Sequence, residues 1–187
     1  MMKDTNKYSL DRKETKSFLT SLQTKKIDKC FVAVFKLAIL TGARISEILS
    51  LTRDDVNLDS RKATITLTNT KNKDVRILFL PRRMASYLLK RHCCKNQKKK
   101  KSERLFPHPR GSFNVVWRRL SKEKLGKNIS PHTLRRTFAL KLIEAGYPLN
   151  QLQHILGHKS LSTTSVYVRV RAQTNPLDFL LQDDDDL

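Results

Sequence analysis

Two short segments rich in β-branched and apolar residues, 63–68 (ATITLT) and 75–80 (VRILFL), constrain the fold of this chain most. Such runs favour β-strands, and the polar stretch between them, with Asn69, Lys71 and Asp74, is typical of a turn. Together they predict a β-hairpin, open to a third strand at its edge. The rest of the chain mostly repeats its apolar residues at helical spacing. The expected fold class is therefore α+β, mostly α-helical, with a small antiparallel β-sheet.

Helical segments are expected on both sides of the hairpin. Asp11 and Glu14 have the spacing of a capping box, which predicts a first helix from Arg12 to about Leu22. Gly146 and Gly157 stand where helix C-caps commonly place a glycine. Apolar periodicity predicts further helices over 27–40, from Arg44 onward, and over 82–92, 113–125, 133–145, 149–156 and 162–170.

The formal net charge is +21, although four aspartates gather at 183–186. A charge of this size predicts a polyanionic partner, because neutralising phosphates releases counterions and so drives association. The partner class is nucleic acid. A basic stretch over 95–104 has no apolar period, which fits either a solvated loop or a loop that touches DNA phosphates. The candidate contacts there are Lys98, Lys99, Lys100 and Lys101.

Several classes of protein are disfavoured. The longest apolar run, 31–40, contains Lys36 and is far shorter than the roughly 20 residues of a membrane span. The N-terminus lacks the apolar block of a secretory signal. Cys30, Cys93 and Cys94 make neither a disulfide framework nor a zinc spacing, and fit reduced thiols in a cytoplasm. We expect a soluble, cytoplasmic protein without membrane contact, metal or cofactor.

The segment 131–137 (PHTLRRT) has the features of an anion site. Pro131 at a helix entry places His132 and Arg135 in the first turn, three residues apart and on one face. The positive end of the helix adds to the arginine charge and suits a phosphate. Taken singly, however, such a pair is weak evidence, and an ordinary surface or structural role is the favoured interpretation.

Two further motifs place charged or reactive residues beside helix-ending glycines. In 41–47 (TGARISE), Arg44 follows a glycine and precedes Glu47 by one turn, the spacing of a weak surface ion pair. In 153–159 (QHILGHK), His158 directly follows Gly157. Tyr167 comes nine residues later, within a segment where a lone tyrosine would usually be a packing residue.

The order and spacing of these features resemble the catalytic domain of the tyrosine recombinases, the phage-integrase family. The shared features are ARxSE, a lysine-bearing hairpin, HxLR, LGH and a tyrosine nine residues later, and they cover roughly 8–172. The resemblance implies a catalytic domain over 1–172 and a C-terminal tail over 173–187. The separate N-terminal core-binding domain, which clamps DNA in most of the family, is expected to be absent.

The resemblance also implies a role for each matching residue. Arg44 and Arg135 would bind the phosphate, Lys71 would be the hairpin lysine, with Lys73 as the alternative if the register differs, and Glu47 would support the site. The full catalytic set implied is Arg44, Lys71, His132, Arg135, His158 and Tyr167.

The chemistry accounts for these residue types. Guanidiniums can hold the non-bridging oxygens of a phosphodiester and stabilise the charge of its transition state. The phenol of Tyr167, with an ordinary pKa of about 10, must lose a proton, for which His132 is the acceptor. Lys71 would protonate the departing 5′-oxygen. The resulting 3′-phosphotyrosine conserves the bond energy, so rejoining needs neither ATP nor metal.

The resemblance leaves several functions open. The preferred one is a site-specific recombinase or integrase acting on double-stranded DNA, with other copies of the chain as dimers or tetramers. The alternatives are the same chemistry in a type IB topoisomerase-like or end-resolving enzyme, and a non-catalytic DNA-binding relative. Residues 176–181 would pack on a neighbouring subunit or on their own domain. Further candidate DNA contacts are Lys73, Arg76, Arg136 and Lys159.

Overall fold

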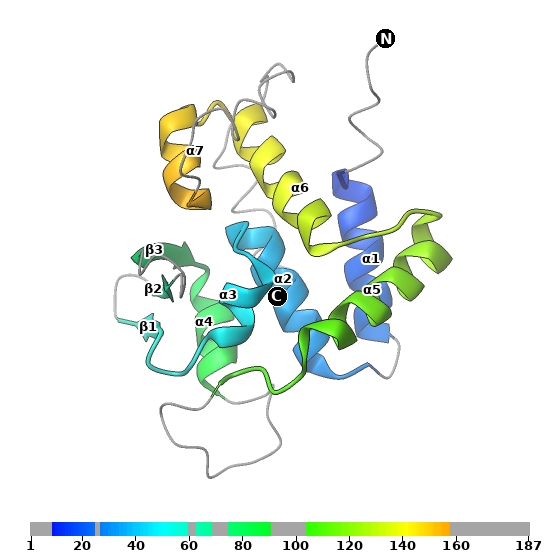
Figure 1. Ribbon diagram of the computed structural model, residues 1–187, viewed down its shortest axis with the longest axis horizontal. Helices are drawn as coiled ribbons and strands as arrows, with labels where there is room; N and C mark the ends of the chain where they lie inside the picture. Colours follow the sequence, from blue (N-terminus) through cyan, green and yellow to red (C-terminus); the bar gives the residue numbers. More distant parts are fainter. Residues whose placement is uncertain (1–8, 25–26, 60–62, 69–74, 91–103, 158–187) are drawn as a thin grey trace.

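The computed structural model describes residues 9–24, 27–59, 63–68, 75–90 and 104–157. Within these ranges it confirms a mostly helical chain with a three-stranded antiparallel sheet (Figure 1). No helix there combines the length and apolar character that a membrane span requires. The elements in chain order are α1 (Arg12–Thr24), α2 (Lys29–Thr41), α3 (Ile45–Ser50), β1 (Val56–Leu58), β2 (Ala63–Thr68), β3 (Val75–Leu80), α4 (Arg82–Leu89), α5 (Arg110–Leu125), α6 (Pro131–Glu144) and α7 (Leu149–Leu156).

The sheet has the order β1-β2-β3 and confirms both the predicted hairpin and its third strand. Thr68 pairs with Val75 and Ala63 with Leu80, so β2 and β3 are aligned along their full length. Alternation along β3 turns Arg76 and Leu78 inward and leaves Val75 and Ile77 exposed. A charged side chain therefore occupies an inward position of the strand.

The helices pack around α2, whose residues are buried along most of its length. This helix contacts α1, α3, α6 and β3, and α3 lies between the sheet and α5 (Figure 1). Aromatic side chains fill the centre, with Phe35 against Phe18 and against the fully buried Trp117. A smaller apolar cluster that includes Phe138 and Leu152 joins α7 to α6.

Some helix ends differ from the predicted ones. The capping box is present, because Glu14 N donates to Asp11 Oδ1 at 2.8 Å and Asp11 N to Glu14 Oε2 at 3.1 Å. However, α5 begins at Arg110, three residues before the predicted start at Phe113, since none of its first three residues has an apolar side chain to mark the helix. The helix α4 ends at Leu89, short of the predicted end at residue 92, which lies outside the described residues.

Candidate active site

Three arginines from separate elements meet at the C-terminal end of α7. Arg76 Nη1 of β3 donates to Ile155 O at 2.5 Å, and Arg135 Nη2 of α6 donates to Leu156 O at 2.6 Å. Arg44 Nη2, at the N-cap of α3, donates to Gly157 O at 3.2 Å. The last carbonyls of a helix lack intrahelical partners and carry the negative end of its dipole. Guanidiniums donate hydrogen bonds to these carbonyls and carry the positive charge that this end of the dipole favours. Three arginine side chains therefore gather at this helix end.

A buried carboxylate holds two of these arginines in place. Glu47 is the third residue of α3, and its Oε2 accepts the backbone N–H of Arg44 at 2.8 Å, as in a capping box. Its Oε1 accepts from Arg44 Nη1 at 3.0 Å and from Arg76 Nη2 at 2.6 Å. The spacing alone indicated a weak surface ion pair, and that interpretation is wrong, whereas the supporting position of Glu47 that the resemblance implies stays a prediction. The Glu47 side chain is only 5% exposed and is shared by two arginines.

Arg135 is fixed by carbonyls on two sides. Besides its bond to α7, its Nη1 donates to Gly42 O at 2.8 Å, and the residue is 7% exposed. Gly42 ends α2 with φ +60°, and Phe138 of α6 fills the space where a Cβ would stand. Because α2 and α6 approach each other closely here, the Gly42 carbonyl lies within hydrogen-bonding distance of Arg135. His132, one turn earlier on α6, is exposed, so the two residues differ in burial.

The first turn of α6 is built by its own side chains. Ser130 is the N-cap, its hydroxyl accepts from Thr133 N at 3.2 Å, and Pro131 occupies the first helical turn. The helix entry that the sequence predicts just before His132 is therefore present.

Several predicted site residues lie outside the described part of the chain. They are Lys71, Lys73, Lys98, Lys99, Lys100, Lys101, His158, Lys159 and Tyr167. Their roles stay predictions, as does DNA contact by Arg136, which is half-buried on α6. For Arg76 the described geometry does not fit the expected DNA contact. Its side chain points inward and donates to Glu47 and Ile155, because strand alternation turns it toward the protein interior.

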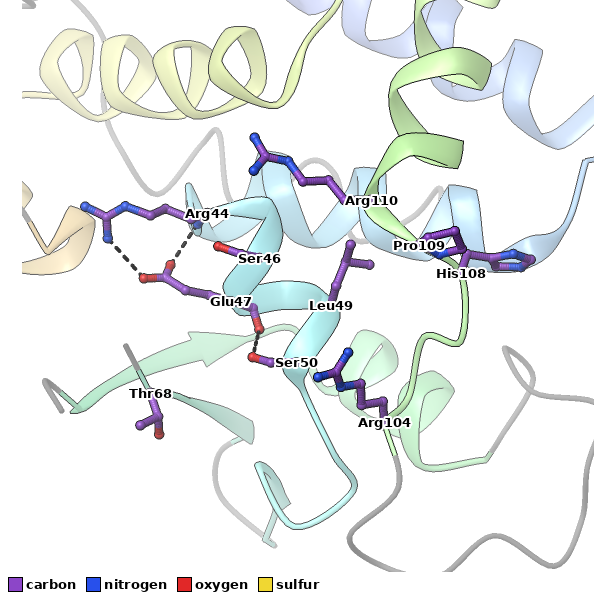
Figure 2. A pocket seen from close by; sticks show the side chains of 10 residues that line it. All are labelled: Arg44, Ser46, Glu47, Leu49, Ser50, Thr68, Arg104, His108, Pro109 and Arg110. Carbon is purple, nitrogen blue, oxygen red and sulfur yellow. Dashed lines mark hydrogen bonds and ion pairs between the residues drawn. The ribbon is translucent and has the colours of Figure 1, made fainter. Parts of the chain in front are cut away.

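A cavity of about 340 Å³ opens beside Arg44 and Glu47 (Figure 2). In Figure 2 two exposed arginines, Arg104 and Arg110, lie on either side of Leu49 of α3. Arg104 is the last residue of the basic stretch 95–104 but was not among its candidate DNA contacts, and Arg110 was not predicted as a site residue. A signal was available, since they bracket a proline-rich turn (RLFPHPR) between the basic stretch and α5. Their position adds positive charge next to the arginine cluster.

Asp28, Cys30 and His108 place three potential metal ligands within 4.8 Å of one another. Hydrogen bonds account for this grouping: Asp28 caps α2 by accepting from Cys30 N at 2.9 Å, and its Oδ2 lies 2.9 Å from His108 Nε2. Partial burial works to raise the pKa of Asp28. The hydrogen bonds from Cys30 and His108 outweigh it and hold the pKa below its usual value. The absence of a metal requirement remains a prediction.

Comparison with known proteins matches residues 8–174 to the Phage integrase family. Tyrosine recombinase XerA of Thermococcus kodakarensis is 30% identical over 177 residues, which cover 88% of this chain and 59% of that protein. Tyrosine recombinase XerD of Corynebacterium glutamicum is 33% identical over 150 residues, covering 76% of this chain and 49% of that protein. The chain therefore spans only about half to three-fifths of these curated relatives.

Solved structures share the fold. The XerH recombinase bound to difH substrate in a pre-cleavage complex has a TM-score of 0.72 at 24% identity, over 87% of this chain and 50% of that one. The catalytic domain of bacteriophage HP1 integrase has a TM-score of 0.66 at 26% identity, over 96% of this chain and 94% of that domain. With its motifs, its fold and the match along most of its length, this chain belongs to the phage integrase family.

Proposed function

We propose that this chain is the catalytic domain of a site-specific DNA recombinase that cleaves and rejoins strands through a 3′-phosphotyrosine at Tyr167. The observation that carries the proposal is the convergence of Arg44 and Arg135 on the carbonyls of Gly157 and Leu156. His158 follows directly in the sequence and Tyr167 nine residues after it. The arginine pair thus stands at the start of the segment that carries the proposed nucleophile.

Arg44 is suited to receive a phosphate oxygen. A guanidinium has five N–H donors, and Arg44 directs one to Glu47 Oε1 and one to Gly157 O. Its side chain remains 40% exposed, so other donors can reach a DNA phosphate. Because Glu47 and Gly157 fix the guanidinium plane beforehand, little reorganisation is needed when the charge of the transition state develops.

The reaction balances as a transesterification. The Tyr167 oxygen forms a bond to phosphorus, the bond from phosphorus to the 5′-oxygen breaks, and His132 takes the phenol proton. Lys71 gives a proton to the departing 5′-oxygen. A 5′-hydroxyl reverses the step by attacking the phosphotyrosine, so rejoining needs no external energy source and calls for no metal or cofactor.

The proposed partner is double-stranded DNA, and XerH, which shares the fold, was solved with its difH substrate. A net charge of +21 supports binding to a polyanion. We assign Arg104 and Arg110 to phosphates that flank the scissile one, since they line the cavity next to Arg44. Assembly of several copies on DNA belongs to the same proposal.

A covalent-trapping experiment tests the proposed function. The protein is incubated with a pool of nicked duplexes with randomised flanks, and protein–DNA adducts are separated on a denaturing gel. The wild type and the control Tyr147→Phe should form an adduct that protease removes, whereas Tyr167→Phe should form none. No adduct from the wild type would refute the catalytic proposal. An adduct that survives in Tyr167→Phe would displace Tyr167 as the nucleophile.

A second measurement separates recombination from relaxation. Trapped sequences are cloned into a supercoiled plasmid, and the products with wild-type protein are examined. Exchange of flanking sequence between two plasmids supports a recombinase. Loss of supercoiling without exchange would instead support a topoisomerase-like use of the same chemistry.

A further inference from the structure

Arg76 is a charged residue at a position that strand geometry reserves for the interior. It is 9% exposed, between the exposed Val75 and Ile77. A buried cation is costly unless it is paired and hydrogen-bonded. Arg76 meets this condition with two charge-assisted bonds, to Glu47 Oε1 at 2.6 Å and to Ile155 O at 2.5 Å. So specific an arrangement calls for a reason beyond filling space.

The two partners of Arg76 connect the parts of the proposed site. Glu47 also binds Arg44 through both its backbone and its side chain. Ile155 is two residues before Gly157, whose carbonyl accepts from Arg44. Arg76 itself is the second residue of β3, and in the sequence it follows Lys71 of the predicted hairpin turn by five residues. One guanidinium therefore links α3, α7 and the strand leading from the hairpin.

We propose that Arg76 is a positioning residue for strand cleavage. It holds Glu47, and through it Arg44, at a fixed distance from the end of α7. Arg44 and the residues after Gly157 can then act on the same DNA phosphate. This inference rests on the proposed function. It replaces the expected DNA contact of Arg76 with an internal role, in which the side chain does not touch the substrate.

The role requires the shape of a guanidinium. Arg76 uses Nη1 for the carbonyl and Nη2 for the carboxylate, so its planar fork spans two acceptors on different elements. A lysine has a single ammonium on a flexible stem. It would keep the charge and could neutralise Glu47, but it would not hold both acceptors in one plane.

The test compares Arg76→Lys and Arg76→Met with the control Arg53→Met. Arg53 is half-buried and, like Arg76, donates to a backbone carbonyl, but this acceptor, Leu89 O at 2.7 Å, lies at the end of α4 and not at the arginine cluster. Three quantities are measured in each protein: the single-turnover cleavage rate at saturating DNA, the Kd for the same DNA, and hydrogen exchange of the amides of residues 155–157. The DNA is the duplex trapped with wild-type protein or, failing that, the randomised pool.

We expect both Arg76 variants to lose about 100-fold in cleavage rate, the scale of a misplaced catalytic group, with a Kd within about twofold of wild type. Exchange at residues 155–157 should become faster in both. Arg53→Met should keep its cleavage rate and its exchange at α7. If Arg76→Met does not fold, Arg76→Lys still tests the inference, because its ammonium keeps a positive charge beside the Glu47 carboxylate.

Two results would overturn the inference. One is unchanged cleavage in Arg76→Lys together with unchanged exchange at α7. The other is a loss of DNA affinity that matches the loss of rate, which would make Arg76 a DNA contact after all. If the wild type forms no adduct, the proposed function fails by itself. The exchange data alone then decide whether Arg76 positions α7.

Discussion

The backbone of Gly157 lies directly against the guanidinium of Arg76. A Cβ placed on Gly157 would come within 2.9 Å of both Cζ and Nη1 of Arg76, closer than real Cβ contacts allow. The same glycine ends α7 with φ +64°, a left-handed conformation that other residues adopt only at a cost. The glycine that closes α7 therefore also leaves room for the arginine that holds it.

Gly157→Ala should therefore impair both stability and catalysis. The left-handed conformation alone costs roughly 1–2 kcal/mol, and Arg76 must shift to admit the methyl group. Gly126→Ala is the matched control, since Gly126 has φ +63° at the end of α5 with nothing within 4 Å of its Cβ position. Urea unfolding and single-turnover cleavage are measured for both. Only Gly157→Ala should slow cleavage, and equal behaviour of the two variants would argue against a role for this contact.

Local sequence patterns predicted the bounds of helices well where a single clear pattern, such as a capping pair or apolar spacing, marked them. The capping residues Asp11 and Glu14 marked the start of α1, and apolar spacing gave the bounds of α7. The strand 75–80 is apolar on both faces, apart from Arg76. The local pattern therefore does not decide which face is buried, and packing against the rest of the protein turns Arg76 inward, although it was expected to contact DNA.

The resemblance to the tyrosine recombinases singled out Arg44, Glu47 and Arg135, but no local pattern predicted how they are arranged. The structure brings all three to the α7 end or to its immediate neighbours, and their catalytic roles stay predictions. Apart from the local Arg44–Glu47 bonds, the bonds that organise them join residues 21 to 113 positions apart. Such long-range contacts follow from how the elements pack, and a local pattern has no information about them.

Removal of charge at the cavity should weaken DNA binding in a salt-dependent way. Log affinity falls linearly with log salt concentration, and each lost phosphate contact makes this line less steep, by about 0.9 in its slope. Arg104→Ala and Arg110→Ala should each show this reduction, and the double variant about twice as much. Lys124→Ala is the control, because Lys124 lies near the far end of α5, roughly 21 Å from Arg110 at 1.5 Å per residue. An unchanged slope in the double variant would show that the cavity does not bind phosphate.

The Asp28 cap should make stability depend on pH in acid. The pKa of Asp28 is lower in the folded protein than its usual value of 3.8, so the folded state binds this proton more weakly. The carboxylate therefore stabilises the protein above about pH 3.8, and this contribution is lost as pH falls through the lowered pKa. Asp28→Asn keeps a capping side chain and removes the charge.

Urea unfolding of wild type and Asp28→Asn from pH 7 to pH 2 measures this contribution. The variant should be less stable at pH 7, by less than about 1 kcal/mol because the pair with His108 is partly exposed. The difference should narrow below about pH 3.8. A difference that is constant across this range would mean that the charge of Asp28 does not contribute.

Thr137 ties the N-terminal segment to α6 through a buried hydrogen bond. Leu10 N donates to Thr137 Oγ1 at 2.9 Å, and Thr137 is 1% exposed. Thr137→Val keeps the shape of the side chain but leaves the Leu10 N–H without its acceptor, which should cost about 1–3 kcal/mol of unfolding free energy.

Thr137→Ser keeps the hydroxyl and should recover most of that loss. Thr15→Val is the control, because the Thr15 hydroxyl donates to a nearby backbone carbonyl, Asp11 O, at the start of α1. Urea unfolding gives the free energies, and hydrogen exchange of the Leu10 amide should quicken in Thr137→Val alone. If the valine variant is as stable as wild type, the attachment of residue 10 to α6 does not stabilise the fold.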